Sequence, residues 1–179
     1  MPTLETVRLN VRELTPADLS AVHESLDAGD PAARDARRWL EWTVASYTQL
    51  AELKQPPYGD RAVVLRKADT LIGLCGLVPC LGPYAPLLGD SESKRAAPEV
   101  GLYWAISAEH RRRGYATEAG RALLDYAFDT LRLRRVIATT TYDNTASMGV
   151  MRKLGMQLHS NPRSEPEWLQ IVGVIDAPG

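Results

Sequence analysis

Residues 111–117 of this 179-residue chain have the composition of an anion-binding turn. Arg111, Arg112 and Arg113 offer fixed positive charge and planar N–H donors, which suit phosphate oxygens. Gly114 lets the backbone approach a ligand closely. An apolar, strand-like run precedes the turn and a helical pattern follows it, and a helix N-terminus offers unpaired N–H groups and partial positive charge. We therefore expect a phosphate-bearing ligand at this turn.

The position of the basic run favours this interpretation over two simpler ones. A run of arginines is usually a solvated surface segment, but its place between a strand and a helix start favours phosphate binding. The turn lacks the Gly-Lys-Ser/Thr ending of a nucleotide P-loop, which argues against ATP hydrolysis. The formal net charge is only −1, so we expect no general affinity for nucleic acid.

Glu99 is the best candidate for a general base, because it opens an alternating strand and shares a face with Tyr103. An exposed carboxylate at a strand end, with no chemical role, explains it equally well. Asn144 and Ser147 flank the start of a short helix, where both residue types commonly cap. Glu118 lies in the first turn of its helix, where a carboxylate stabilises the helix by interacting with its dipole, so we expect no catalytic role for it.

Hydrophobic periodicity predicts the elements that hold these residues. A half-buried strand is expected over 7–12, followed by a helix that starts at Thr15–Asp18, has Leu19, Val22 and Leu26 on its apolar face and ends at Gly29. The remaining expected elements are a helix over 32–53, strands at 61–66 and 71–78, a loop over 79–98, a strand at 99–106, a helix from the basic turn to about 131, a strand at 136–142, a helix at 146–154 and strands at 156–159 and 168–175. This order predicts an α/β or α+β layered fold, a mixed sheet with helices packed on it.

Composition narrows the class of protein. The length fits one domain over residues 1–179, and 45% hydrophobic with 24% charged residues is typical of a soluble globular chain. We find no bilayer-spanning apolar run and no signal-peptide pattern, so the expectation is a cytoplasmic protein that does not enter a membrane. Cys75 and Cys80 are the only cysteines and the three histidines are scattered, so neither a disulfide nor a metal site is expected.

Several segments, taken together and in order, resemble one family. The turn Arg111-x-x-Gly114-x-Ala116 matches the Q/R-x-x-G-x-G/A signature of the GNAT (Gcn5-related N-acetyltransferase) family, although Arg112 stands where the family commonly has glycine. The matching segments also include Glu5–Leu9, Leu14–Leu19, Ile72–Gly76, Glu99–Trp104, Asn144–Ser147 and Val150–Met156. The set is most similar to the branch that contains ribosomal-protein N-terminal acetyltransferases.

The resemblance implies a fold and a site. It implies a mostly antiparallel sheet flanked by helices, in which the strands at 99–106 and 135–142 splay apart and acetyl-pantetheine lies in the gap. Glu99 and Ser147 become the catalytic candidates, with Ser147 near the thioester sulfur. The residues implied to bind acetyl-CoA are Trp104, Ala105, Ile106, Arg111, Arg112, Arg113, Gly114, Tyr115, Ala116, Thr117 and Asn144.

The implied function is N-acetyl transfer from acetyl-CoA to a primary amine, a protein N-terminus or a small molecule, by direct attack in a ternary complex. The acceptor pocket would be built by the first two helices and the loop over 79–98, with Trp39, Trp42, Tyr47 and Tyr58 available. The alternative is a catalytically silent CoA-binding module, because residues 147–151 lack the tyrosine found there in many members and Gly149 replaces a common arginine. A monomer and a homodimer are equally compatible with the sequence.

Overall fold

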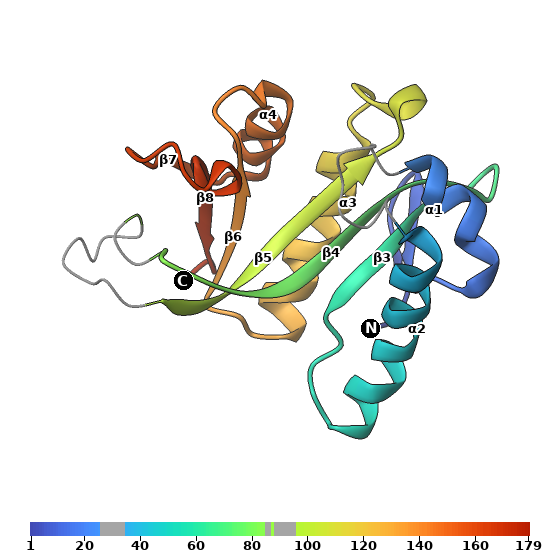
Figure 1. Ribbon diagram of the computed structural model, residues 1–179. Coiled ribbons are helices and arrows are strands. Elements are labelled where there is room, and N and C mark those ends of the chain that lie inside the picture. Colours follow the sequence, from blue (N-terminus) through green and yellow to red (C-terminus); the bar gives the residue numbers. More distant parts are fainter. Residues whose placement is uncertain (26–34, 85–86, 88–95) are drawn as a thin grey trace. The chain divides into compact units, whose positions relative to one another are not determined.

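The computed structural model describes residues 1–25, 35–84, 87 and 96–179, and Figure 1 shows their helices and strands. The strands are β1 (Leu4–Glu5), β2 (Leu9–Arg12), β3 (Gly59–Leu65), β4 (Thr70–Gly82), β5 (Ala97–Ile106), β6 (Arg135–Thr140), β7 (Gln157–Ser160) and β8 (Ile171–Asp176). The helices are α1 (Leu19–Ser25), α2 (Ala36–Glu52), α3 (Tyr115–Asp125) and α4 (Thr145–Leu154). Short 3-10 turns occur at Pro16–Asp18, Ala108–His110 and Glu167–Leu169, and α3 continues as a π-helical turn over Tyr126–Thr130.

The eight strands form an open sheet in the order β1-β2-β3-β4-β5-β6-β8-β7. Pairing is antiparallel between β1 and β2, β2 and β3, β3 and β4, β6 and β8, and β7 and β8. β5 and β6 run parallel and share a single register pair, Gly101 with Ile137, whereas β6 and β8 share six. The predicted mixed, mostly antiparallel sheet is confirmed, and the short β5–β6 pairing fits the expected splay.

The chain divides into two compact units, each made from two segments. The first contains Met1–Leu77 and Tyr103–Leu123, and the second contains Val78–Leu102 and Leu124–Gly179. The chain passes between the units within β4, within β5 and within α3. The expectation of one domain over 1–179 stays a prediction.

In the first unit, α1 and α2 pack on the sheet, and Figure 1 shows α2 alongside β3. The predicted apolar stripe of α2 is confirmed, because Leu40 and Thr43 are buried and Trp39 and Val44 pack against the same core. Asp35 caps this helix by accepting a 3.1 Å hydrogen bond from the N–H of Arg38. The buried members of the core cluster are Leu14, Val22, Leu40, Ala62, Val64 and Leu74.

The predicted helix start at Thr15–Asp18 is confirmed. The N–H of Thr15 donates to Asp18 Oδ2 at 2.7 Å, and Pro16 occupies the first turn, where its missing N–H costs nothing. Asp18 also accepts from Arg12 Nη2 at 2.8 Å. Burial alone would raise the pKa of Asp18, but the hydrogen bonds from Arg12 and Thr15 outweigh it and hold the pKa below its ordinary value.

In the second unit, α4 packs near β6 and β7. Its predicted C-terminus is confirmed, because Gly155 has a left-handed φ of 88° and its N–H returns to the carbonyl of Arg152 at 3.1 Å. The core cluster of this unit comprises Tyr84, Ile137, Leu169, Val172 and Val174.

Three predicted strand ends are wrong. Val7 is 91% exposed at a turn between β1 and β2, closed by a 2.9 Å hydrogen bond from Thr6 N to Leu9 O. Tyr142 lies beyond the end of β6, where its hydroxyl donates to the carbonyl of Asn161. Trp168 belongs to the 3-10 turn before β8 and is 48% exposed. In each case an apolar or aromatic side chain extends the hydrophobic pattern beyond the residues that pair in the ladder.

The predicted loop over 79–98 is shorter than expected. β4 runs on to Gly82 and β5 begins at Ala97, so Pro79 and Cys80 belong to a strand. Exposure alternates there, with Pro79 exposed and Cys80 half-buried, and a proline is tolerated in a strand where its N–H is not needed by the ladder. Cys75 is buried as predicted, and both cysteines are free thiols.

Some predictions fall on residues outside the described part of the chain. They are the positions of Leu26 and Gly29, the beginning of the helix expected over 32–53, and residues 85–86 and 88–95 of the expected loop.

Candidate active site

The basic turn lies in the first unit, between β5 and α3, where the sequence predicts it. Two of its residues have left-handed backbone conformations, Arg112 with φ 59° and Gly114 with φ 83°. These reversals curl the chain tightly before α3, and successive N–H groups in such a curl make an anion-binding concavity. Arg111, Arg112 and Arg113 are all exposed around it.

Arg111 also supports the turn. Its Nε donates a 2.8 Å hydrogen bond to the carbonyl of Ile106, the last residue of β5. This contact ties the end of the strand to the turn, so the predicted sites Trp104–Ile106 and 111–117 are joined within one unit. Arg111 therefore has a structural contact in addition to the phosphate contact expected from the sequence.

The N-terminus of α3 presents its first N–H groups at this turn. The N–H of Glu118 is the one that bonds to the carbonyl of Gly114, at 3.0 Å. The preceding N–H groups of Tyr115, Ala116 and Thr117 belong to the first helical turn, which has no carbonyl upstream within the helix to accept them. Together with the helix dipole they favour a bound anion.

Sequence reasoning missed the segment that braces the turn. Arg8 Nε donates to Glu118 Oε2 at 2.6 Å, and Arg8 Nη1 donates to the carbonyl of Arg113 at 3.0 Å. The guanidinium carbon of Arg8 lies 4.4 Å from the centroid of the Tyr115 ring. Thr6 Oγ1 donates to Glu118 Oε1 at 2.6 Å. The residues around Arg8 do not predict its contact with Glu118, because the two residues are 110 positions apart in sequence.

Glu118 therefore does more than stabilise the start of α3 through the helix dipole, because it also pairs with the N-terminal segment. Burial alone would raise the pKa of its carboxyl group, but the hydrogen bonds from Thr6 and from the backbone and guanidinium of Arg8 hold the pKa below its ordinary value. The carboxylate is thus kept ionised and paired at the start of α3.

The other predicted residues lie in the second unit. Asn144 Oδ1 accepts a 3.0 Å hydrogen bond from the N–H of Ser147, so the capping role of Asn144 is confirmed. Ser147 is half-buried in the first turn of α4. Glu99 is half-buried on β5, and its carbonyl accepts a 3.4 Å hydrogen bond from the Cys80 thiol. Both of these hydrogen bonds are made by the backbone of Glu99 and Ser147.

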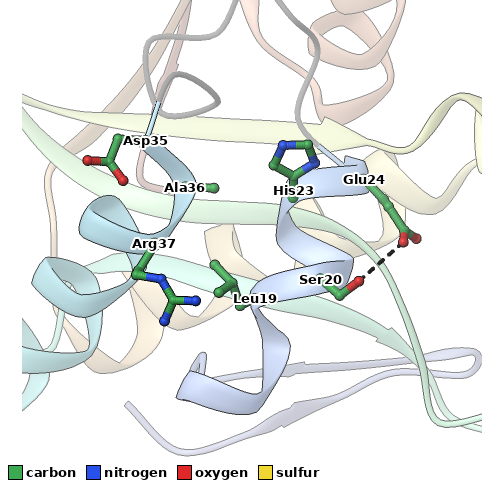
Figure 2. A pocket seen from close by; sticks show the side chains of 7 residues that line it. All are labelled: Leu19, Ser20, His23, Glu24, Asp35, Ala36 and Arg37. Carbon is green, nitrogen blue, oxygen red and sulfur yellow. Dashed lines mark hydrogen bonds between the residues drawn. The ribbon is translucent and has the colours of Figure 1, made fainter.

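A pocket of about 470 Å³ lies between α1 and α2 in the first unit, and Figure 2 shows its lining. Glu24 and Asp35 supply carboxylates to it, and Glu24 accepts a 3.3 Å hydrogen bond from Ser20. Its lining comprises Leu19, Ser20, His23, Glu24, Asp35, Ala36 and Arg37. The aromatic side chains suggested for an acceptor pocket do not line it, although Trp39 and Trp42 belong to the same helix α2.

Arg112 gives a testable consequence of the turn geometry. A side chain in the left-handed region costs about 1–2 kcal/mol, and glycine relieves this strain, although the extra backbone freedom that glycine loses on folding offsets part of the gain. We expect Arg112→Gly to raise the free energy of unfolding by up to about 1 kcal/mol, measured by urea denaturation. The matched control is Arg121→Gly, at an exposed position inside α3, which should lower stability because glycine disfavours helix interiors. A loss of stability in Arg112→Gly would contradict this prediction.

The geometry is that of a tight basic turn leading from a strand into a helix N-terminus, and the comparisons assign the family. The family model described as "Acetyltransferase (GNAT) domain" matches residues 8–157. The chain therefore belongs to the GNAT family and is an acetyl-CoA-dependent N-acetyltransferase by class. The described helices contain none with the length and apolar character to cross a bilayer.

Individual relatives are distant but extend along most of the chain. "Uncharacterized N-acetyltransferase YnaD" of Bacillus subtilis is 28% identical over 158 residues, covering 86% of this chain and 82% of the relative. The spermidine N(1)-acetyltransferase of Escherichia coli is 27% identical over 158 residues, covering 88% and 76%. An acetyltransferase structure from Agrobacterium tumefaciens has a TM-score of 0.69 at 27% identity, covering 98% and 94%.

Solved structures named for the predicted branch share the fold of this chain. Three solved structures named as ribosomal-protein acetyltransferases, two of them from Vibrio cholerae and Vibrio fischeri, match with TM-scores of 0.66, 0.69 and 0.67. Each covers 98% of this chain, and this chain covers 97% or 98% of each. Their identities of 18%, 14% and 14% show a common fold and nothing finer.

Proposed function

We propose that this enzyme transfers the acetyl group of acetyl-CoA to a primary amine by direct attack within a ternary complex. The observation that supports this most strongly is the turn over 111–117, whose two left-handed residues and exposed arginines lead into the N-terminus of α3. Such a turn suits the pyrophosphate of the donor. The family match supplies acetyl-CoA as that donor.

The first unit would bind the donor. Arg113 and the N–H groups of Gly114 to Thr117 would hold the pyrophosphate, while Arg111 would share its guanidinium between Ile106 and the phosphates. The exposed Arg112 adds charge at the same place. The backbone of Trp104–Ile106, at the end of β5, would pair with the pantetheine arm in the way that a neighbouring strand would.

Glu99 and Ser147 are the proposed catalytic residues. The Glu99 carboxylate takes the proton from the substrate ammonium, directly or through water, and so frees the nitrogen lone pair. The nitrogen then forms the C–N bond at the thioester carbonyl as the C–S bond breaks and CoA leaves as its thiolate. The new amide nitrogen loses its second proton to water, so that a neutral amide remains. Ser147 donates a hydrogen bond to the departing sulfur, and a thiolate is a tolerable leaving group near neutral pH because thiols have a pKa of about 8.5. Asn144 holds the start of α4 in place.

The acceptor is proposed as a primary amine of one of two kinds. The Escherichia coli relative is named for spermidine, and the structural neighbours named for ribosomal proteins suggest a peptide N-terminus. The pocket between α1 and α2 is the proposed acceptor site, and Glu24 would pair with the amine there, while Arg37 lines the same pocket. A panel of polyamines and short peptides with free N-termini, assayed by thiol release, discriminates between them.

Catalysis should depend on Glu99. We expect Glu99→Gln to lower kcat about a hundredfold or more, since a positioned general base contributes about 10²–10⁴-fold. Acetyl-CoA affinity measured by calorimetry should stay at the wild-type value, because Glu99 is not among the proposed donor contacts.

The matched control is Glu167→Gln, an exposed carboxylate of the same unit, which should leave kcat unchanged. Full activity in Glu99→Gln would remove Glu99 as the base.

A catalytically silent CoA-binding module is the second candidate, favoured by the absence of tyrosine from 147–151 and by the empty space around Gly149. Acetyl-CoA binding by wild type without turnover of any amine in the panel would establish that candidate.

A further inference from the structure

Arg8 makes a set of contacts that a surface arginine does not need. It lies just before β2, in a segment far from the basic turn in sequence, and its guanidinium bonds two parts of that turn region at once. Its Nε donates to Glu118 Oε2 at 2.6 Å, and its Nη1 donates to the carbonyl of Arg113 at 3.0 Å. Nη2 lies 3.4 Å from the position that a Cβ on Gly114 would occupy. A fourth guanidinium therefore stands beside the three arginines of the turn.

The neighbouring acid explains why a cation is needed at that place. Glu118 lies on the first turn of α3, the end of the helix where the phosphates are proposed to bind. An unpaired carboxylate there would repel the phosphates and compete for the free N–H groups. Glu118 Oε1 accepts from Thr6 and from the N–H of Arg8, and Oε2 accepts from the Arg8 side chain, so the carboxylate charge is paired.

We propose that Arg8 is a positioning residue for the donor's pyrophosphate. It fixes the Arg113 carbonyl, so that the turn keeps its N–H groups and arginine side chains toward the ligand, and it neutralises Glu118 beside the ligand. The inference rests on the proposed function, because it assumes that the pyrophosphate of acetyl-CoA lies at 111–117.

The chain offers a matched control in Arg66. This arginine secures the same N-terminal segment, since its Nη1 donates to the carbonyl of Thr6 at 2.7 Å and its Nη2 pairs with Glu5 at 3.1 Å. Its side chain is 42% exposed, close to the 43% of Arg8. Its side chain bonds Thr6 and Glu5 of the N-terminal segment, so Arg66→Ala removes an equivalent arginine while the bonds of Arg8 to Glu118 and to the Arg113 carbonyl stay in place.

The experiment compares Arg8→Ala, Arg8→Lys and Arg66→Ala with the wild-type protein. Acetyl-CoA affinity is measured by calorimetry, and inorganic pyrophosphate is the probe for the turn, as a competitor of acetyl-CoA. We expect Arg8→Ala to weaken both acetyl-CoA and pyrophosphate about tenfold, the effect of losing one charge-assisted contact. Arg8→Lys should lose less affinity for both ligands than Arg8→Ala, because an ammonium keeps the positive charge. It should still lose some affinity, because an ammonium cannot bridge Glu118 and the Arg113 carbonyl together. Arg66→Ala should bind both as wild type does.

At saturating acetyl-CoA, kcat should be unchanged in all three variants, so that the defect of Arg8→Ala lies in KM for the donor. Wild-type affinity in both Arg8 variants would overturn the inference while leaving the proposed function intact. A loss for acetyl-CoA that pyrophosphate does not share would also overturn it, because the defect would then lie away from the turn. Failure of the wild-type protein to bind acetyl-CoA would overturn the proposed function itself.

Discussion

Replacing Gly114 by valine is expected to weaken acetyl-CoA binding by more than about a hundredfold in total. This loss exceeds the one expected from removing a single arginine. Gly114 has φ 83°, a conformation that a β-branched residue adopts only under strain. Its Cβ would also point at Arg8, whose Nη2 lies 3.4 Å away, so two branched methyl groups would displace the guanidinium that braces the turn. The carbonyl of Gly114 accepts the first hydrogen bond of α3, so the helix start would move as well.

The measurement is calorimetric affinity for acetyl-CoA beside the melting temperature of each variant. Arg113→Ala is the reference, expected to lose roughly ten- to a hundredfold because one charge-assisted contact is worth about 1.5–3 kcal/mol. Arg111→Ala should lower acetyl-CoA affinity by a similar factor. It should also lower the melting temperature, because the Nε of Arg111 donates a hydrogen bond to the carbonyl of Ile106. Gly114→Ala, which adds a single methyl group, should fall between wild type and Gly114→Val. Unchanged acetyl-CoA affinity in Gly114→Val would remove the basis for the donor site.

Gly73→Ala is expected to lower the free energy of unfolding by about 3 kcal/mol, a large effect for one methyl group. Gly73 is buried on β4, and a Cβ there would lie 2.3 Å from the carbonyl oxygen of Ala105 and 2.9 Å from Ile106 Cδ1. The nearest of these atoms belongs to the backbone of β5, which cannot move aside as a flexible side chain would. Since Ala105 and Ile106 are proposed to align pantetheine, acetyl-CoA affinity should fall too.

The same substitution at Gly149 supplies the control and should have the opposite sign. Gly149 lies inside α4, and a Cβ built there meets nothing within 4 Å. Alanine in a helix interior is favoured over glycine by about 0.5–1 kcal/mol, so Gly149→Ala should stabilise the protein by that amount. Urea denaturation of both variants measures the contrast. A destabilisation by Gly149→Ala equal to that of Gly73→Ala would contradict the packing that distinguishes these glycines.

Much of the fold could be predicted because its signals are local. The turn over 111–117 was found from a strand, three arginines, a glycine and a helix start that follow one another directly in the chain. The same holds for α4, which begins at the cap of Asn144 and ends at the left-handed Gly155. Each of these features is decided by residues within one helical turn, so their sequence spacing is enough to specify them.

The contacts that brace and pack the site could not be predicted in this way. Arg8 meets Glu118 across 110 residues, and the close approach of Ala105 to Gly73 depends on how two strands lie beside each other. The exposure of Val7 and the extension of β4 through Pro79 to Gly82 likewise depend on where the backbone leaves or keeps its ladder. Alternating hydrophobicity states which side a residue would face if it were in a strand, but not where pairing begins or ends.

Short-range signals were enough to predict the basic turn over 111–117 and the order of the elements other than β1. Which distant side chains hold that turn in place became evident only from the folded chain, because contacts between distant residues depend on the path of the whole backbone.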